Sequence, residues 1–232
     1  MLNFDHFEVL TFDCYGTLID WESGIWNSLD PILRAHGQSM AQEEALELYA
    51  GFEVQAESGE YHAYRAVLGM VLERFGQHLG FAPSPAELES FSISVKFWPA
   101  FPDSARALQA LHTKYRLAII SNIDDDLFAY SEHRLQVKFD FVITAQQARS
   151  YKPSLNNFRL AFERIGLPPA KILHVAQSLY HDILPAKSLG LANVWVNRRH
   201  GKTGSGATPP AQAQPDVEVP DLESLAIRMG LL

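Results

Sequence analysis

The sequence has a single cysteine, Cys14, among its 232 residues, so no disulfide can form within the chain. A chain without disulfides is typical of a reducing compartment. It also has no apolar run of about 18 residues, and no basic segment followed by an apolar core at its start. Those two patterns mark a membrane span and a secretory signal. Their absence predicts a soluble, cytoplasmic protein.

Positive charge is scarce as well. The chain has 19 lysines and arginines against 27 aspartates and glutamates, giving a net charge of −8 and a pI of about 5.6. An acidic chain is poorly suited to nucleic acid or to an anionic membrane, so we expect neither as a partner. With 47% hydrophobic and 20% charged residues, the chain can bury a core as one large domain or as a domain with an insertion.

The segment FEVLTFDCYGTLID near the start combines a strand pattern with a polar turn. Its first six residues are mostly apolar and β-prone, which indicates a strand buried on both faces. Asp13 follows directly, and Gly16 allows a tight turn beside a ligand. Open α/β sheets bind ligands at the carboxyl ends of their strands. Asp13 is therefore a candidate catalytic carboxylate with the Thr17 hydroxyl as its partner, although an aspartate that merely caps the turn has the same pattern.

Residues 21–97 have a helical pattern. Apolar residues recur three or four positions apart in about four stretches, with no convincing strand between them. Ser84 before Pro85 is a plausible N-cap for the last of these helices. Two prolines, Pro99 and Pro102, then interrupt the pattern. The sequence thus predicts a helical cap at 21–97, inserted into an α/β core made of 1–20 and 98–232.

Strands and helices alternate after this point, which implies a parallel sheet with right-handed crossovers, as in a Rossmann-like α/β fold. The predicted strands are Arg116–Ser121, Phe139–Thr144, Ile172–Ala176, Val194–Val196 and Val217–Val219. A helix is predicted over Asp182–Leu189. The segment HGKTGSGATPPAQAQP, residues 200–215, is predicted to be a loop or flap because it is rich in Gly, Ala, Pro and Gln.

Polar residues follow further predicted strands. Ser121 and Asn122 could hold a substrate carboxylate, or they could open the next helix as caps. Lys152 in the Tyr-Lys-Pro segment could balance nearby carboxylates, although such a lysine in isolation is usually a surface residue. Taken in series with Asp13 and Asp182, these residues predict one site at the carboxyl edge of the sheet.

These segments resemble the motifs of the haloacid dehalogenase superfamily. DCYGTL is similar to its first motif, in which the aspartate, here Asp13, is a covalent nucleophile. The phosphatases of the superfamily usually carry a second aspartate where this sequence has Tyr15. A tyrosine there is the form seen in the 2-haloacid dehalogenase (type II) branch. The resemblance implies the haloacid dehalogenase fold with a helical cap over the site, and it places Tyr15 among the substrate contacts.

The segment QSLYHDI resembles the fourth motif, whose acids bind Mg²⁺ in the phosphatases. Asp182 matches the second acid, but Gln177 or Ser178 replaces the first. Because Mg²⁺ prefers several oxygen ligands with carboxylates among them, and Lys152 can supply the positive charge, we expect no metal and no cofactor. Ser178 and His181 are expected beside the substrate. His181 could be an auxiliary acid or base, or simply a partner of Asp182.

The resemblance implies a hydrolase of a small 2-substituted carboxylic acid. Asp13 would attack the carbon that bears the leaving group, and water activated by Asp182 would hydrolyse the resulting ester. Lys152 and Thr17 would keep Asp13 ionised and aimed. Substrate and water are the expected partners. Aromatic residues on the cap helices fit a homodimer as well as they fit core packing.

One feature departs from the dehalogenase pattern. That branch carries a cap arginine that receives the halide and the substrate, but the corresponding segment LYAGF has none. Arg65 is the better placed of two replacements, ahead of Arg34, and an exposed helix-face residue is the alternative for it.

Other functions stay open for that reason. The segments SVKFWPAFPD, SYKPSLNNF and RRHGKTGSGAT resemble ring-opening hydrolases of the L-azetidine-2-carboxylate type, in which a ring nitrogen is the leaving group. A Mg²⁺-dependent phosphatase and a non-catalytic binding protein are further alternatives.

Overall fold

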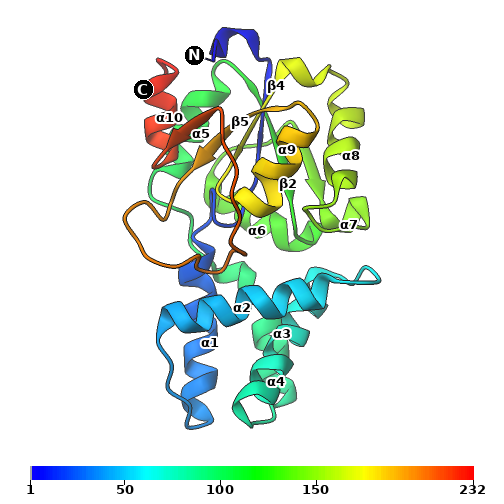
Figure 1. Ribbon diagram of the computed structural model, residues 1–232, viewed down its shortest axis with the longest axis vertical. Coiled ribbons are helices and arrows are strands. Elements are labelled where there is room, and N and C mark those ends of the chain that lie inside the picture. The colour runs from blue at the N-terminus through cyan, green and yellow to red at the C-terminus, as the bar shows by residue number, and fades with distance from the viewer. Residues whose placement is uncertain (1) are drawn as a thin grey trace.

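Six parallel strands form one sheet in the computed structural model, which describes residues 2–232 (Figure 1). The strands are β1 (Val9–Phe12), β2 (Arg116–Ser121), β3 (Phe141–Thr144), β4 (Ile172–Ala176), β5 (Ala192–Val196) and β6 (Val217–Val219). Their order across the sheet is β3-β2-β1-β4-β5-β6. The chain therefore fills one side of β1 first and then crosses to the other side. Such a reversal is where open α/β sheets bind their ligands.

Alternate residues of the strands pack on opposite faces of the sheet. In β2, Leu117 and Ile119 join one hydrophobic cluster, whereas Ala118 and Ile120 join the other. The first cluster packs against α5 (Ser104–His112), α6 (Asp125–Leu135) and α10 (Leu222–Arg228). The second packs against α8 (Leu155–Ile165) and α9 (Leu184–Ser188). A sheet covered on both faces explains why its strands read as continuous apolar runs.

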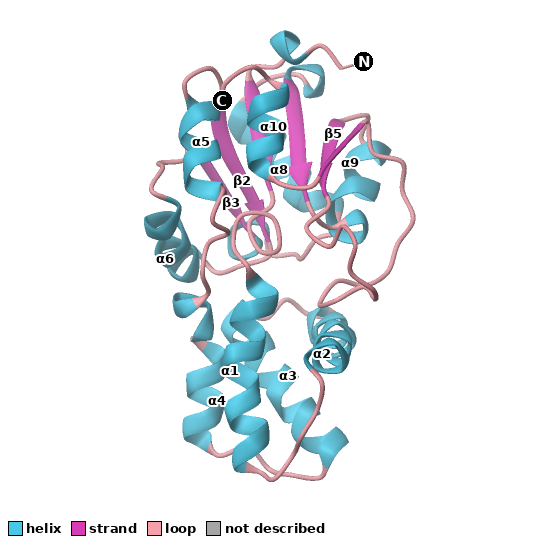
Figure 2. Cartoon of the chain, turned by 90° about the vertical axis from the view of Figure 1, so that its left-hand side faces the viewer, coloured by secondary structure: helices cyan, strands magenta, loops and turns pink. Residues whose placement is uncertain are grey.

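Four helices from the predicted insertion lie together at the end of the molecule below the sheet (Figures 1 and 2). They are α1 (Trp21–Ala35), α2 (Gln42–Glu57), α3 (Tyr64–Leu79) and α4 (Pro85–Ser92), and we call them the cap. The predicted start of α4 is confirmed, because Ser84 and Glu87 form a capping box and Pro85 is in the first turn. Buried residues of the cap continue the hydrophobic cluster that covers one face of the sheet.

Short elements complete the chain. They are the 3₁₀ turns Phe4–His6, Ser94–Phe97 and Pro169–Lys171, the helix α7 (Ala145–Ala148) and a turn of π-helix at Leu179–Ile183. The predicted helix Asp182–Leu189 is wrong in its first turn, because the π-turn comes first and α9 begins only at Leu184. Within residues 2–232, none of the helices combines the length and hydropathy that a membrane span needs.

The segment between β5 and β6, residues 197–216, leaves the sheet as a long loop and reaches the cap (orange in Figure 1). We call it the flap. Its Arg199 guanidinium donates to Glu22 of α1 at 2.7 and 2.8 Å, and to Glu43 of α2 at 2.7 Å. The prediction of a loop here is confirmed, and its ion pairs hold it against two cap helices.

Candidate active site

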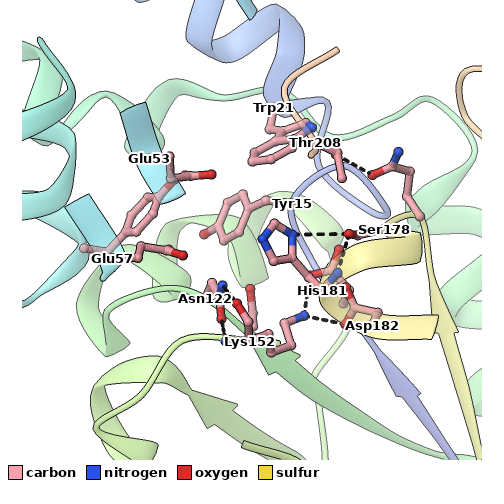
Figure 3. Close-up of a pocket in the computed structure, with 14 residues that line it drawn as sticks. Tyr15, Trp21, Glu53, Glu57, Asn122, Lys152, Ser178, His181, Asp182 and Thr208 are labelled. Atoms are coloured by element: carbon pink, nitrogen blue, oxygen red, sulfur yellow. Dashed lines mark hydrogen bonds and ion pairs between the residues drawn. The ribbon is translucent and has the colours of Figure 1, made fainter. Parts of the chain in front are cut away.

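A cavity lies between the carboxyl edge of the sheet and the cap (Figure 3). The core contributes Asp13, Ser121, Lys152 and Asp182 to its lining, together with other residues that follow the same strands. The cap contributes Trp21, Glu53, Glu57 and Tyr64, and the flap contributes Thr208. The cavity is therefore bordered by three parts of the chain that are distant in sequence.

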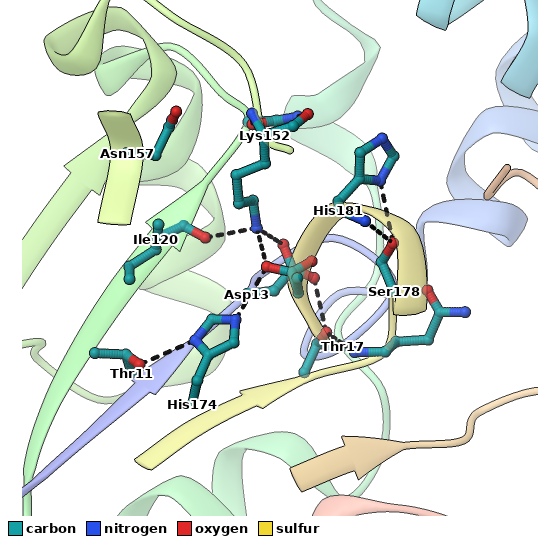
Figure 4. A network of polar contacts seen from close by, with 12 residues as sticks. Thr11, Asp13, Thr17, Ile120, Lys152, Asn157, His174, Ser178 and His181 are labelled. Atoms are coloured by element: carbon teal, nitrogen blue, oxygen red, sulfur yellow. Dashed lines mark hydrogen bonds and ion pairs between the residues drawn. The ribbon is translucent and has the colours of Figure 1, made fainter. Parts of the chain in front are cut away.

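Lys152 joins the two aspartates at the centre of the site (Figures 3 and 4). Its Nζ lies 2.9 Å from Asp13 Oδ1 and 2.6 Å from Asp182 Oδ1, and it donates to the Ile120 carbonyl oxygen at 2.8 Å. Lys152 and Asp182 are each 1% exposed and Asp13 is 6% exposed. The structure thus brings together three residues that follow three different strands, β1, β3 and β4. Their three hydrogen bonds use every donor of the ammonium group.

Thr17 holds the other oxygen of Asp13. Its hydroxyl donates to Asp13 Oδ2 at 2.7 Å and accepts from the Gln177 backbone N–H at 2.9 Å. Gly16 makes the turn between them at a φ of +92°, a conformation that favours glycine. Both oxygens of the Asp13 carboxylate are consequently fixed in orientation.

Burial and charge act in opposite directions on this cluster. Burial raises the pKa of Asp13, while the Lys152 ammonium opposes that rise. Burial also disfavours ionised Asp182, but Lys152 and His174 outweigh it and hold the pKa of Asp182 below its usual range. The two carboxylates in turn raise the pKa of Lys152 against the effect of burial. The ammonium therefore stays charged at neutral pH.

His174 is a member of this network that sequence reasoning missed. It lies on β4, is fully buried, and places Nε2 3.0 Å from Asp182 Oδ1 and Nδ1 2.9 Å from Thr11 Oγ1 (Figure 4). The signal was a histidine in the apolar strand ILHVA, because a buried ring nitrogen needs a hydrogen-bond partner. His174 fixes the orientation of Asp182, whose Oδ2 has no hydrogen-bond partner among the described residues.

Ser121 and Asn122 both line the cavity, but they differ in whether their side chains are free to hydrogen-bond to a substrate. The Asn122 side chain accepts from the Lys152 backbone N–H at 2.7 Å and donates to the Lys152 carbonyl at 3.1 Å. Asn122 therefore positions Lys152, which leaves little of its amide for a substrate. Ser121 Oγ is fully buried and has no hydrogen-bond partner in the described chain, so its hydroxyl is available to a ligand.

Ser178, His181 and Tyr15 also line the cavity. Ser178 Oγ accepts from the His181 backbone N–H at 2.8 Å and lies 3.2 Å from His181 Nδ1. Burial lowers the pKa of His181 to about 4, so its ring is neutral at pH 7 and a poor proton donor. The Tyr15 hydroxyl is 2.9 Å from Ser131 Oγ, outside the Asp13 cluster.

Arg65, the predicted substrate contact, is not among the residues that line this cavity. The Asp124 carboxylate accepts from the Tyr64 and Arg65 backbone N–H groups at 2.8 and 3.1 Å and thereby caps α3. The Arg65 guanidinium pairs with Asp126 and lies 3.7 Å from Asp124, with 41% of the side chain exposed. Its charge is used to join the cap to α6.

Replacing Arg65 by alanine is therefore expected to change kcat/KM by less than about threefold, because an exposed ion pair outside the cavity contributes little to binding. Steady-state kinetics on any substrate of the enzyme checks this. A rise in KM of tenfold or more would instead support Arg65 as a substrate contact.

Two cap glutamates, Glu53 and Glu57, were not predicted from the sequence. Glu53 is 4% exposed, and its Oε1 accepts from the Tyr64 hydroxyl at 2.7 Å and the Tyr49 hydroxyl at 3.1 Å. Burial raises the pKa of Glu53 to about 7. Burial and the neighbouring Glu53 also raise the pKa of the partly buried Glu57 well above its usual value. The signal was an acid on the apolar face of a helix that also carries Leu46 and Tyr49.

No group of three or more histidines, cysteines, aspartates or glutamates in the described chain is arranged to hold a metal ion. Between Asp13 and Asp182, the Lys152 ammonium fills the space.

Comparison with known proteins identifies the family. A model of the haloacid dehalogenase-like hydrolases matches residues 7–190. The (S)-2-haloacid dehalogenase 4A of Burkholderia cepacia is 26% identical over 208 residues, which cover 84% of this chain and 85% of that protein. The haloacid dehalogenase-like hydrolase domain-containing protein 3 of Danio rerio is 28% identical over 149 residues, and the match spans 61% of this chain and 62% of that protein.

The fold also matches solved structures. The L-2-haloacid dehalogenase of Xanthobacter autotrophicus with covalently bound chloropropionic acid aligns with a TM-score of 0.78 and 23% identity, covering 97% of this chain and 98% of that one. The prediction of an α/β fold of the haloacid dehalogenase type is confirmed. With the family model covering most of its length, the chain belongs to the haloacid dehalogenase-like hydrolases and is an enzyme.

Proposed function

We propose that this hydrolase displaces the leaving group from C2 of a small 2-substituted carboxylic acid through an ester on Asp13. The observation that supports this most directly is the buried Asp13 carboxylate, fixed by Thr17 and Lys152 at the wall of the cavity. A carboxylate removed from bulk water and held in one orientation is suited to attack on carbon.

In the first step an Asp13 oxygen forms a bond to C2 while the bond from C2 to the leaving group breaks. The leaving group departs with the electron pair. The Ser121 hydroxyl, which has no partner in the described chain, would donate to the carboxylate of the substrate. Inversion at C2 follows from displacement on the face opposite the leaving group.

In the second step a water molecule attacks the carbonyl carbon of the Asp13 ester. Asp182 would take the proton of that water through Oδ2, since His174 and Lys152 already occupy Oδ1. Lys152 would stabilise the negative charge that develops on the ester oxygen. Cleavage returns the Asp13 carboxylate and releases a 2-hydroxy acid.

A halide is the first candidate for the leaving group. The Burkholderia relative is named for (S)-2-haloacids, and the Xanthobacter structure contains chloropropionic acid bound covalently. A halide departs as an anion and needs no proton donor, which agrees with the neutral His181 beside the site.

A ring nitrogen is the second candidate, as in ring-opening hydrolysis of L-azetidine-2-carboxylate. The observation that favours it is the charge of the cavity wall. No arginine is among the lining residues that the structure describes, and the cap presents Glu53 and Glu57 instead. When they are ionised, these carboxylates repel a departing halide and attract a protonated amine.

The ester is tested by a single turnover in ¹⁸O-labelled water with enzyme in excess over substrate. The label is expected in the Asp13 carboxylate and not in the product, because water attacks the ester carbonyl. Mass spectrometry of the peptide that contains Asp13 reads this out. Label that enters the product directly in the first turnover would contradict the ester.

The leaving group is tested with the same enzyme on 2-chloropropionate, fluoroacetate and L-azetidine-2-carboxylate. A halide electrode and an assay for primary amines distinguish the two candidates. Inactivity on all three, together with chelator-sensitive hydrolysis of p-nitrophenyl phosphate, would contradict the proposal and favour a metal-dependent phosphatase.

A further inference from the structure

The cavity beside Asp13 is nearly closed. Its volume is about 30 Å³, which is room for about two water molecules. Most of the residues that line it are buried, and the partly exposed ones are Glu57, Asn122 and Gln177. A substrate therefore reaches Asp13 only where a side chain at the edge of the cavity moves aside.

A second and larger cavity lies beyond Gln177. We call it the flap pocket. It has a volume of about 470 Å³ and lies between the flap and residues at the carboxyl ends of β4 and β5. Gln177 and Thr208 line both cavities. Their side chains form the partition between the two, since the Thr208 hydroxyl donates to Gln177 Oε1 at 3.2 Å. Figure 3 shows Thr208 across the active-site cavity from Glu57.

We propose that the flap pocket is the entrance to the active site, and that a small carboxylate anion passes through it to Asp13 when the Gln177 and Thr208 side chains separate. This inference rests on the proposed function for the carboxylate of the substrate, and it adds the route that this substrate takes. The charge of the flap pocket, the way in which Gln177 is held and the attachment of the cap to the core support it.

The lining of the flap pocket is basic, although the chain is acidic. It contains Arg199, His200 and Lys202, and none of the lining residues described is an aspartate or a glutamate. Arg199 is paired with Glu22 and Glu43, whereas Lys202 is exposed and forms no ion pair within residues 2–232. An ammonium group at the mouth of a pocket raises the local concentration of an anion. It thereby counters the net charge of −8, which repels such a substrate from the rest of the surface.

The Gln177 side chain can move without disturbing Asp13. Its backbone N–H donates to Thr17 Oγ1 at 2.9 Å, and its carbonyl oxygen accepts from Trp195 Nε1 at 2.7 Å. The Thr17 hydroxyl in turn holds Asp13 Oδ2 at 2.7 Å. The orientation of the nucleophile thus depends on the backbone of Gln177. The partition depends on its side chain, through a hydrogen bond between two neutral groups, which is weaker than one to a charged group.

Opening the cap instead would break stronger and more numerous contacts. The Asp124 carboxylate of the core accepts from two backbone N–H groups of α3, at 2.8 and 3.1 Å. The Tyr151 hydroxyl donates to the His62 carbonyl oxygen at 2.7 Å, and buried cap residues continue the hydrophobic cluster of the core. Separating Gln177 from Thr208 leaves all of these contacts in place. The smaller motion is therefore the favoured way in.

A removable obstruction in the flap pocket tests the entrance. Ala211 lines this pocket but not the active-site cavity, so Ala211→Cys places a thiol in the proposed route. The single native cysteine, Cys14, is buried, and burial raises the pKa of its thiol, so a benzyl methanethiosulfonate reacts with the introduced thiol alone. Dithiothreitol removes the benzyl group again. Gln212→Cys is the matched control, because Gln212 is the exposed next residue and does not line the pocket.

The measurement is ¹⁹F NMR exchange of 3,3,3-trifluoropropionate, a carboxylate without a leaving group at C2. We expect the benzyl group on Ala211→Cys to lower the rate constants for binding and for release by about tenfold or more, with Kd within about twofold of the unlabelled protein. An obstructed route slows both directions equally, whereas a damaged site changes Kd. The label on Gln212→Cys should change neither rate constant by more than about twofold, and dithiothreitol should reverse the effect at Ala211→Cys.

Thr208→Val tests the partition in the same measurement. Valine keeps the branched shape of the side chain but cannot donate to Gln177, so the two side chains separate more readily. Both rate constants are expected to rise by about threefold. A loss of local packing alone would change Kd and would not raise binding and release together.

Lys202→Gln tests the charge of the entrance. The rate constant for binding should fall by about threefold at low salt and should match the wild type at about 0.5 M NaCl, where exposed charges are screened. Lys138→Gln is the control, because Lys138 is an exposed lysine that precedes β3 and so lies towards the amino edge of the sheet. An equal effect of the two variants would contradict attraction by the flap pocket.

Unchanged exchange in the benzyl-labelled Ala211→Cys protein would overturn the entrance, and the edge of the cavity at Glu57 and Asn122 would then be the route. A rise in Kd on labelling would also overturn it, because the acid would bind in the flap pocket instead of passing through. Exchange needs no turnover, so ¹⁸O in Asp13 tests the ester separately. Obstructed exchange without that label would support the entrance and contradict the displacement. Label in Asp13 with unobstructed exchange would have the opposite meaning.

Discussion

Replacing Lys152 by methionine is expected to lower kcat by about 10³-fold or more, and to lower the free energy of unfolding by about 3–5 kcal/mol at pH 7. Methionine has a similar length and fills the same buried space, so packing is largely kept. The loss comes from charge, because Asp13 and Asp182 would remain buried beside each other without the cation that both now contact. Steady-state kinetics and urea unfolding measure the two effects.

The loss of stability in Lys152→Met is expected to depend on pH with a definite sign. In the wild type the pKa of Asp182 is lowered, so its ionised form adds stability above the unfolded pKa, and that stability is lost as the pH falls. Without Lys152 both carboxylates favour the protonated form, so acid relieves their repulsion. The stability difference between variant and wild type should therefore shrink from pH 7 to pH 5.

Lys171→Met is the matched control for this experiment. Lys171 pairs with Glu8 at 3.3 Å, but both side chains are well exposed, at 35% and 50%, so its loss should cost less than about 1 kcal/mol. Similar unfolding curves for Lys152→Met and Lys171→Met would mean that the buried cluster does not depend on the ammonium.

The fold could be predicted from the sequence because its strands are covered on both faces. Arg116–Ser121, Ile172–Ala176 and Val217–Val219 end where the apolar pattern ends, and the four cap helices follow their own periodicity. The turn at Leu179–Ile183 could not be predicted in the same way. Ser178 accepts from the His181 backbone N–H and the chain then winds as a π-turn, and no periodicity distinguishes that winding from an α-helix.

The core half of the site could also be predicted from the sequence. The carboxyl ends of parallel strands meet at one edge of the sheet and bring Asp13, Lys152 and Asp182 together. The cap half of the site could not be predicted in this way. Which face of α2 meets that edge depends on how the cap packs on the core, so the sequence alone does not predict that Glu53 lines the cavity and that Arg65 lies outside its lining. Contacts with Asp124 and Asp126, far along the chain, determine where Arg65 lies.

Asp13→Asn is expected to lower turnover by about 10⁴-fold or more, because a neutral amide is a far weaker nucleophile than a carboxylate and no second group replaces it. The fold should persist. Asparagine has the same shape, its side-chain oxygen can still accept from Lys152, and the pKa of Asp13 is already raised by burial, so removing its charge is tolerated. We expect the free energy of unfolding to stay within about 2 kcal/mol of the wild type.

Asp20→Asn is the control that makes this result specific. Asp20 is a nearby carboxylate outside the lining of the cavity, and it caps α1 by accepting from the Ser23 backbone N–H at 3.2 Å. Asparagine caps a helix about as well as aspartate, so this variant should keep nearly full activity. If Asp13→Asn retained more than about 1% of wild-type turnover while it was folded, the displacement could not proceed through this carboxylate. Asp182, the other buried carboxylate in contact with Lys152, would then have to be tested as the nucleophile.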